Sequence, residues 1–233
     1  MRAPALTILQ LDTRFPRIPG DIGCPDTFLE AVEVIKVPGA RVDRIVTDDP
    51  ARIDIGPFEK ALARARGAIV ATSCGFLSFW QDHLQKRTDR PLFSSSLMLL
   101  PRLAGRVKPA NTVILTFDAD RLTCGHLQGQ DAFRRSVLGL GPDSHLRRII
   151  EADRFDLDAR AGLRDVIGTL GRETRRRDVR LCLMECTNLP PYAAALEREF
   201  GFPVFSILDL LEEARPGLVK PRHISRQSLG WFE

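Results

Sequence analysis

The sequence of 233 residues has no apolar run close to the roughly 18–20 residues that a membrane-spanning helix requires, so a membrane protein is not expected. The short apolar run at the N-terminus soon meets Asp12 and Arg14, which predicts a first strand rather than a signal peptide. Without a secretory signal, the reducing cytoplasm is the expected compartment.

The sequence also lacks cysteine and histidine pairs at the spacings typical of metal sites. The five cysteines contain no Cys-x-x-Cys pair, and the four histidines (His83, His126, His145 and His223) are scattered along the chain. A structural zinc site is therefore not expected, and we predict no metal.

No aromatic residue interleaves with the arginines of the most basic segment. The net charge is +4, and the densest positive segment is a cluster of five arginines between Arg172 and Arg180. Cations complement the dipole at the C-terminal end of a helix, so this cluster is expected on a solvated helix end. Nucleic acid is therefore not an expected partner. With 44% hydrophobic and 27% charged residues, the chain has the composition of a globular protein.

Strand and helix patterns alternate twice along the chain. Strands are expected at residues 5–11, 32–37, 68–72, 112–116, 136–140, 179–184 and 202–205, and helices at 56–66, 78–87, 95–103, 118–127, 143–152, 157–175, 189–200 and 207–214. The segment 105–111 has the composition of a linker. This order predicts an α/β fold of two similar domains, each with a mainly parallel sheet flanked by helices. We expect residues 1–107 and 208–233 in the first domain and residues 108–207 in the second.

Two short segments each place a cysteine where an apolar run stops and a turn of small residues begins. They are Ala71-Thr-Ser-Cys74-Gly75 and Leu183-Met-Glu-Cys186-Thr187-Asn188. Each precedes a stretch that can begin a helix, where free backbone N–H groups and the helix dipole stabilise a thiolate. Ligands of parallel sheets bind beyond the carboxyl ends of the strands. Because Thr13 and Thr116 also follow strands, we predict one site in the cleft between the two domains.

Structural roles remain open for several of these residues. Asp12 and Thr13 lie in a long loop rich in proline and glycine, where ordinary capping is an alternative to substrate contact. Thr116 and Asn188 are alternatively N-caps of the helices that follow them. The other cysteines, Cys24, Cys124 and Cys182, are expected to be structural.

With these motifs the chain resembles the aspartate/glutamate/hydantoin racemase superfamily. The resemblance covers most of the chain and rests on Leu11-Asp12-Thr13, Thr-Ser-Cys74-Gly75, Leu115-Thr116 and Glu185-Cys186-Thr187-Asn188. It implies a cofactor-independent racemase or epimerase that acts on a small carboxylate or carbonyl substrate. One of the two cysteines would remove the proton α to the carboxylate or carbonyl, and the other would return a proton on the opposite face.

The resemblance also implies the roles of individual residues. Cys74 and Cys186 would be catalytic, and the substrate-binding residues would be Asp12, Thr13, Ser73, Gly75, Phe76, Thr116, Thr187 and Asn188. Backbone N–H groups of Gly75 and Thr187, with the hydroxyls of Thr116 and Thr187, would stabilise the enolate.

The residues after each cysteine depart from the pattern of the amino-acid racemases. Gly75-Phe76 stands where those enzymes usually carry Asn-Thr, and Thr187-Asn188 stands where they usually carry Thr-His or Thr-Glu. An amino-acid substrate is therefore not favoured. The alternatives are a maleate-type cis–trans isomerase with a covalent cysteine adduct, and a non-catalytic small-molecule binding protein on the same scaffold. A homodimer is the expected default assembly.

Overall fold

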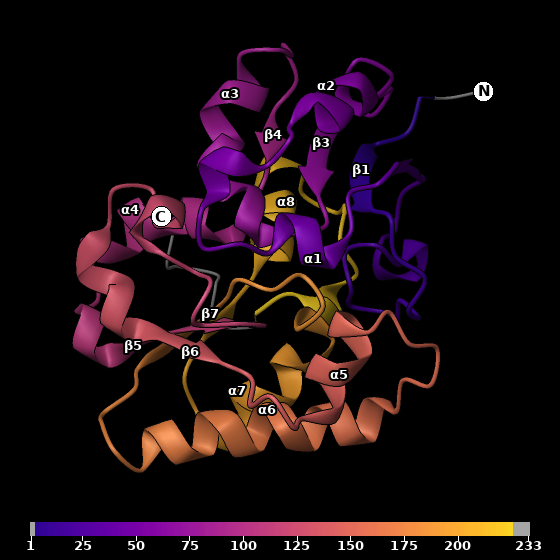
Figure 1. Cartoon of the computed structure of the whole chain (residues 1–233). Coiled ribbons are helices and arrows are strands. Elements are labelled where there is room, and N and C mark those ends of the chain that lie inside the picture. Colours follow the sequence, from indigo (N-terminus) through magenta and orange to yellow (C-terminus); the bar gives the residue numbers. More distant parts are fainter. Residues whose placement is uncertain (1–2, 226–233) are drawn as a thin grey trace.

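The computed structural model describes residues 3–225 and contains two sheets of four strands each (Figure 1). The first sheet consists of β1 (Leu6–Leu11), β2 (Val32–Val37), β3 (Ile69–Thr72) and β4 (Leu92–Phe93), and the second of β5 (Thr112–Thr116), β6 (Val137–Gly139), β7 (Leu181–Met184) and β8 (Val204–Phe205). All pairings between these strands are parallel. The strand orders, β2-β1-β3-β4 and β6-β5-β7-β8, show that the second sheet repeats the topology of the first.

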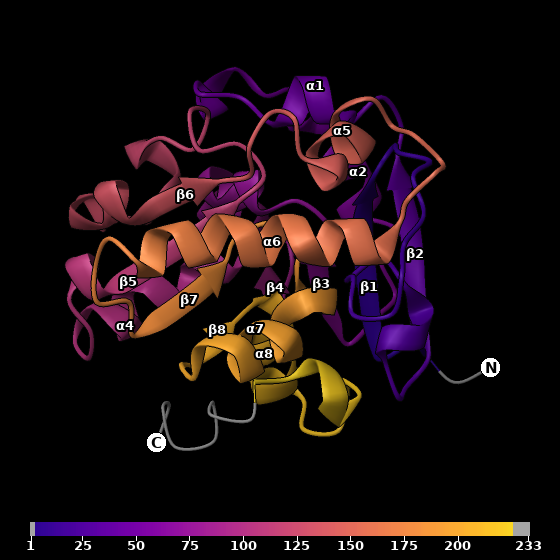
Figure 2. The ribbon, with the colours of Figure 1, turned by 90° about the horizontal axis from the view of Figure 1, so that it is seen from below.

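Helices flank both sheets. They are α1 (Val42–Ile45), α2 (Gly56–Leu62), α3 (Gln81–Gln85), α4 (Leu100–Ala104), α5 (His145–Glu151), α6 (Ala159–Thr174), α7 (Ala193–Phe200) and α8 (Ile207–Ala214). Figure 2 shows α6, the longest of these, beside β5 and β7, and its Val166 and Leu170 share a core with Leu181. The predicted fold class, two α/β halves with parallel sheets, is confirmed.

Strand β1 is buried on both faces, and four of its six residues are apolar. Successive side chains of a strand point to opposite faces. Leu9 and Leu11 belong to the large core that extends into the second half, whereas Leu6 and Ile8 belong to a smaller cluster on the other face. A parallel sheet covered on both faces requires such a strand.

Helix α8 covers that other face of the first sheet. Ser206 begins the helix with a capping box, in which its hydroxyl accepts from the Leu208 N–H and Asp209 accepts from the Ser206 N–H. Leu208 and Leu211 then pack in the cluster of Leu6 and Ile8. Helix α8 thus returns to the first sheet. The domain boundaries themselves stay a prediction, and residues 226–233 lie outside the described part.

The predicted helix over 118–127 is wrong. The segment is a loop with a short 3-10 helix at Cys124–His126, because Thr123 and His126 form a local capping box that uses the backbone donors of this turn. The predicted helices at 78–87 and 95–103 each begin as 3-10 helices, at Gly75–Trp80 and Ser96–Leu99, before α3 and α4.

The arginine-rich end of α6 contacts the segment before β5. The Arg177 guanidinium donates to the carbonyls of Ala110, at 2.8 Å, and Thr112, at 2.9 Å, and pairs with Glu173 at 2.6 Å. Part of the cluster therefore fixes the entry into the second sheet. Within residues 3–225, no helix is both long enough and apolar enough to cross a membrane.

Candidate active site

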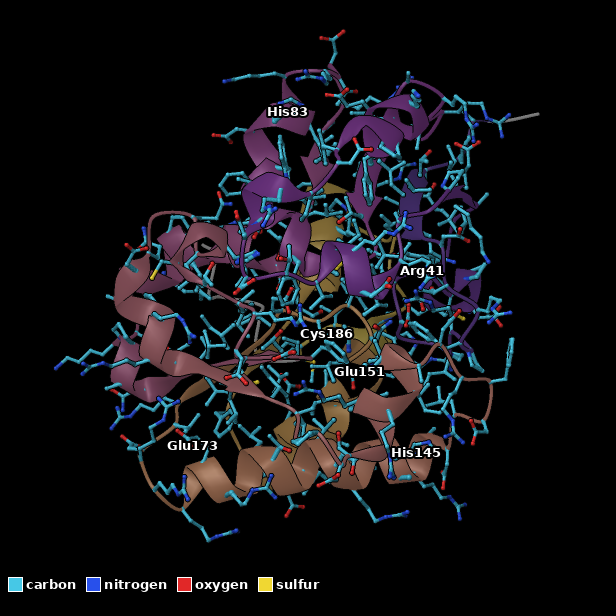
Figure 3. The ribbon with its side chains drawn as sticks, viewed as in Figure 1. Arg41, His83, His145, Glu151, Glu173 and Cys186 are labelled. Atoms are coloured by element: carbon cyan, nitrogen blue, oxygen red, sulfur yellow. The ribbon has the colours of Figure 1, made fainter. Side chains whose placement is uncertain are left out.

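The two cysteines lie at equivalent places in the two halves. Cys74 follows β3 and Cys186 follows β7, and each of these strands is the third of its sheet along the chain. In the first sheet β1 lies between β2 and β3, and in the second sheet β5 lies between β6 and β7. Each cysteine therefore follows the strand at which the strand order reverses. Open parallel sheets bind ligands at this switch point. Figure 3 shows Cys186 in the middle of the molecule, with His83 and His145 at its periphery.

Hydrogen bonds between the two halves hold the two strand ends together. The Thr187 hydroxyl donates to the Ser73 carbonyl at 2.7 Å, and the Asn188 amide donates to Asp21 at 2.6 Å. The Ser96 hydroxyl donates to the Met184 carbonyl at 2.7 Å. The geometry between the two thiols is therefore fixed by both halves.

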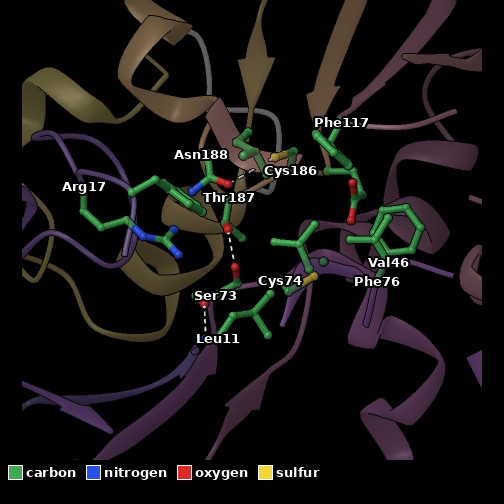
Figure 4. A pocket seen from close by; sticks show the side chains of 15 residues that line it. Leu11, Arg17, Val46, Ser73, Cys74, Phe76, Phe117, Cys186, Thr187 and Asn188 are labelled. Atoms are coloured by element: carbon green, nitrogen blue, oxygen red, sulfur yellow. Dashed lines mark hydrogen bonds between the residues drawn. The ribbon is translucent and has the colours of Figure 1, made fainter. Parts of the chain in front are cut away.

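Cys74 and Cys186 line one cavity at the junction of the two halves (Figure 4). Its wall consists of Leu11, Phe15, Arg17, Val42, Val46, Ser73, Cys74, Gly75, Phe76, Phe117, Ile150, Glu185, Cys186, Thr187 and Asn188. Each of the two cysteines is 8% exposed. A mostly apolar cavity with a few polar groups is typical of a small-molecule site.

Seven of the ten residues singled out in the sequence line this cavity, and three do not. The three are Asp12, Thr13 and Thr116. Asp12 and Thr13 line a separate hollow, where Asp12 accepts from the Gly39 N–H and Thr13 accepts from Arg17. Thr116 is fully buried and donates its hydroxyl to Glu185. Their hydroxyl and carboxylate groups serve neighbouring side chains and backbone.

The polar groups that do line the cavity are partly engaged. The sequence analysis expected the Thr187 hydroxyl to donate to the substrate. In the structure this hydroxyl donates to the Ser73 backbone carbonyl instead. The Ser73 hydroxyl accepts from the Leu11 N–H at 2.9 Å and keeps its own hydrogen to donate. The Cys186 thiol donates to the Asn188 side-chain oxygen at 3.6 Å.

Glu185 is a site residue that the sequence reasoning missed. It is 1% exposed, and one of its carboxyl oxygens accepts from Thr116 while the other has no hydrogen-bond partner. Burial raises the pKa of this carboxyl to about 7. Its signal in the sequence was its place directly before Cys186, where a charged side chain ends an otherwise apolar strand.

Arg17 is the second missed residue. Its side chain is 10% exposed, donates to Thr13 at 2.9 Å, and pairs with Asp21 at 3.2 Å. Its guanidinium lies 4.2 Å from the centre of the Phe15 ring, and its Nε has no hydrogen-bond partner. The only signal in the sequence was the length of the loop that carries it.

The thiols are not stabilised as thiolates in this cavity, contrary to the expectation from the sequence. Burial and the charge of Glu185 raise the pKa of Cys74 to about 12, and the same two causes raise the pKa of Cys186 well above its ordinary value. The N–H groups of Phe76 and Asn188 lower these pKa values, but by less. The turn after Cys74 is a 3-10 helix, whose short length gives a weak dipole.

This geometry predicts the alkylation pattern of the resting protein. At about pH 7, iodoacetamide is expected to modify Cys124 and to leave Cys74 and Cys186 unmodified, because it attacks exposed thiolates. Cys124 is exposed, whereas the other four cysteines are buried. Peptide mass spectrometry measures the pattern, with Cys124→Ser as the unlabelled control. Rapid labelling of Cys186 at this pH would contradict it.

Metal ligands are not gathered in the described part of the chain. Among residues 3–225, no group of three or more His, Cys, Asp or Glu side chains is placed to hold a metal ion.

Solved structures share this fold. The sulfate-associated form of a glycine-to-cysteine variant of arylmalonate decarboxylase superposes with a TM-score of 0.56 at 16% identity, covering 95% of this chain and 98% of that one. A glutamate racemase isoform from Bacillus anthracis superposes with a TM-score of 0.53 at 11% identity, covering 93% of this chain and 84% of that one. The chain therefore has the fold of the aspartate/glutamate/hydantoin racemase superfamily, and the predicted resemblance is confirmed as a likeness of fold.

Curated proteins with similar sequences carry a different name. Dimethylsulfoniopropionate lyase 5 of Emiliania huxleyi is 27% identical over 225 residues, which is 90% of this chain and 44% of that protein. The dimethylsulfoniopropionate lyase of Durusdinium sp. clade D is 26% identical over 222 residues, which is 88% of this chain and 71% of that protein. The chain thus spans less than half the length of the first relative. No protein-family profile matches it.

These relatives overturn the predicted activity. The expectation of a racemase or epimerase is wrong, because the similar curated proteins are named lyases, at 25–27% identity over 88–98% of this chain. That the chain is an enzyme is supported, but an isomerase is not.

Proposed function

We propose that this protein is a lyase that cleaves dimethylsulfoniopropionate, or a closely similar sulfonium carboxylate, by β-elimination with a cysteine as the base. The observation that carries the proposal is that Cys74 and Cys186 line one buried cavity with an arginine whose Nε is unpartnered. The names of the relatives supply the substrate class. The mostly apolar lining with a few polar groups is typical of a small-molecule site.

The proposed reaction begins with removal of the proton on the carbon α to the carboxylate. A cysteine first gives its thiol proton to water, and the resulting thiolate takes the proton from the α carbon. The electron pair of the broken C–H bond forms a double bond between the α and β carbons. The bond from the β carbon to sulfur breaks, and both of its electrons go to sulfur. The products are acrylate and neutral dimethyl sulfide, and the cysteine is again a thiol. The step is redox-neutral, and its atoms balance without a co-reactant.

The leaving group explains why a carbanion in this fold would undergo elimination rather than racemisation. A sulfonium at the β carbon departs as a neutral sulfide and needs no proton. A carbanion formed beside it therefore eliminates faster than it recovers a proton. One base is sufficient for this chemistry, whereas racemisation requires a group on each face of the carbanion.

Incubation with dimethylsulfoniopropionate tests the proposal directly. The purified protein is expected to release dimethyl sulfide and acrylate in equal amounts, measured by headspace gas chromatography and by NMR. Cys124→Ser, which changes an exposed thiol outside the cavity, is the control and should match the natural protein. Absence of dimethyl sulfide from protein shown to be folded would overturn the proposal. The cytoplasmic location and the homodimer stay predictions.

A further inference from the structure

The polar end of the cavity contains Arg17. In Figure 4 its guanidinium lies on the same side as Ser73, Thr187 and Asn188. Two of its nitrogens are held by Thr13 and Asp21, so the head group has a fixed orientation. The buried Nε–H has no acceptor. A buried donor without a partner is costly, and an incoming anion would satisfy it.

The opposite end of the cavity is apolar. Figure 4 shows Val46, Phe76 and Phe117 grouped away from Arg17, with Cys74 and Cys186 between the two ends. Aromatic faces attract cations through the ring quadrupole, most strongly where water is excluded. This end suits a soft organic cation with methyl groups.

The carboxyl of Glu185 belongs to this apolar end. One oxygen accepts from Thr116, the neighbour of Phe117, and the other lies against Gly75, the neighbour of Phe76. The second oxygen has no hydrogen-bond partner. Glu185 is therefore a buried acidic group in the cavity wall, with one oxygen that has no hydrogen-bond partner.

We infer that the cavity recognises a zwitterion by its two ends, with Arg17 holding the carboxylate and Glu185 acting as the counter-ion of a methylated cation between Phe76 and Phe117. This inference rests on the proposed function, because it assigns the two charged ends of the sulfonium carboxylate. It places the carbon that loses its proton beside the cysteines.

Glu185 also connects substrate binding to the reactivity of the thiols. Its negative charge raises the pKa of both Cys74 and Cys186, and a cation that pairs with it removes this effect. The other charged groups near the thiols are Arg17, which lowers the pKa of Cys74, and Asp21, which raises that of Cys186. A cationic substrate thus favours ionisation of the base, whereas a neutral analogue does not.

Two ligands of equal shape and different charge test the inference by calorimetry. They are 3-(trimethylammonio)propanoate, a zwitterion, and 4,4-dimethylpentanoate, its uncharged-tail isostere. The natural protein is expected to bind the zwitterion at least about tenfold more tightly. Glu185→Gln, which keeps the size of the side chain, should remove this preference and change affinity for the isostere by less than about twofold. Arg17→Met should weaken both ligands by about tenfold or more.

Proton release gives a second measurement that needs no variant. A cation beside Glu185 lowers its pKa from about 7, so at about pH 7 binding of the zwitterion should release protons. The isostere should release fewer, and the difference appears when calorimetry is repeated in buffers of different ionisation enthalpy.

The outcomes separate this inference from the proposed function. Equal affinity of the natural protein for both ligands, or a Glu185→Gln protein that keeps the preference, overturns the inference even if dimethylsulfoniopropionate is cleaved. A preference for the zwitterion that depends on Glu185, without cleavage of dimethylsulfoniopropionate, supports the inference and overturns the proposed function.

Discussion

Replacing the cysteine that serves as the base, Cys74 or Cys186, with alanine is expected to lower the turnover of dimethylsulfoniopropionate by roughly 100- to 10,000-fold, the usual contribution of a positioned base. Both thiols line the cavity, but elimination requires only one base, so alanine at the other position should lower turnover by less. Dimethyl sulfide release under saturating substrate measures kcat, and thermal unfolding shows that the variants are folded.

Serine variants identify which thiol is the base. A serine hydroxyl is a much weaker acid than a thiol, so serine at the position of the base should be as inactive as alanine. Serine at the other position can still donate a hydrogen bond and should recover part of the activity. Cys182→Ala is the matched control, because Cys182 is a buried thiol on β7 outside the cavity. Alanine variants of both Cys74 and Cys186 that retain full turnover would falsify the proposed chemistry.

Gly75→Ala is expected to be among the most damaging single substitutions. A Cβ at this position would overlap a carboxyl oxygen of Glu185 and would lie 2.5 Å from the Glu185 backbone carbonyl oxygen. The contact joins the two halves at the cavity, so relief requires Cys74 and Cys186 to move relative to each other. Overpacking of this kind costs about 1–3 kcal/mol. We expect a lower free energy of unfolding in urea and a loss of turnover that exceeds the loss of folded protein.

Gly141→Ala is the control for this substitution. A Cβ at Gly141 meets nothing within 4 Å, so its effect on stability should stay within about 0.5 kcal/mol. If Gly75→Ala unfolds at the same urea concentration as the Gly141 variant and turns over normally, the close contact with Glu185 has no functional role.

The sequence predicted the parts of the site that follow from periodicity and strand ends. Ser73, Cys74 and Gly75 follow an apolar run, as do Cys186 and Thr187, and the structure places all of them at the wall of one cavity. A polar residue at a strand end does not by itself reveal which way its side chain points. Thr116 is the example, since its hydroxyl donates to Glu185, 69 residues further along the chain.

The residues that were missed depend on contacts that no local pattern encodes. Arg17 lies in a loop whose path is set by hydrogen bonds, including the bond from the Gly20 N–H to Thr27. Glu185 ends a strand, where an exposed position is ordinarily expected for a carboxylate. Its burial follows from the approach of Gly75 from the other half. The sign of the thiol pKa shifts was missed for the same reason, because desolvation depends on the closed cavity.

The two sheets have the same strand order, but the cavity between them has chemically different ends. Equivalent positions carry unlike residues: Ser73 precedes the first cysteine and Glu185 the second, while Gly75 follows the first and Thr187 the second. A pair of matching halves would present the same groups to both faces of a bound molecule. Here the two halves share a strand order but carry different side chains at equivalent positions. A ligand with two different ends therefore has one preferred orientation.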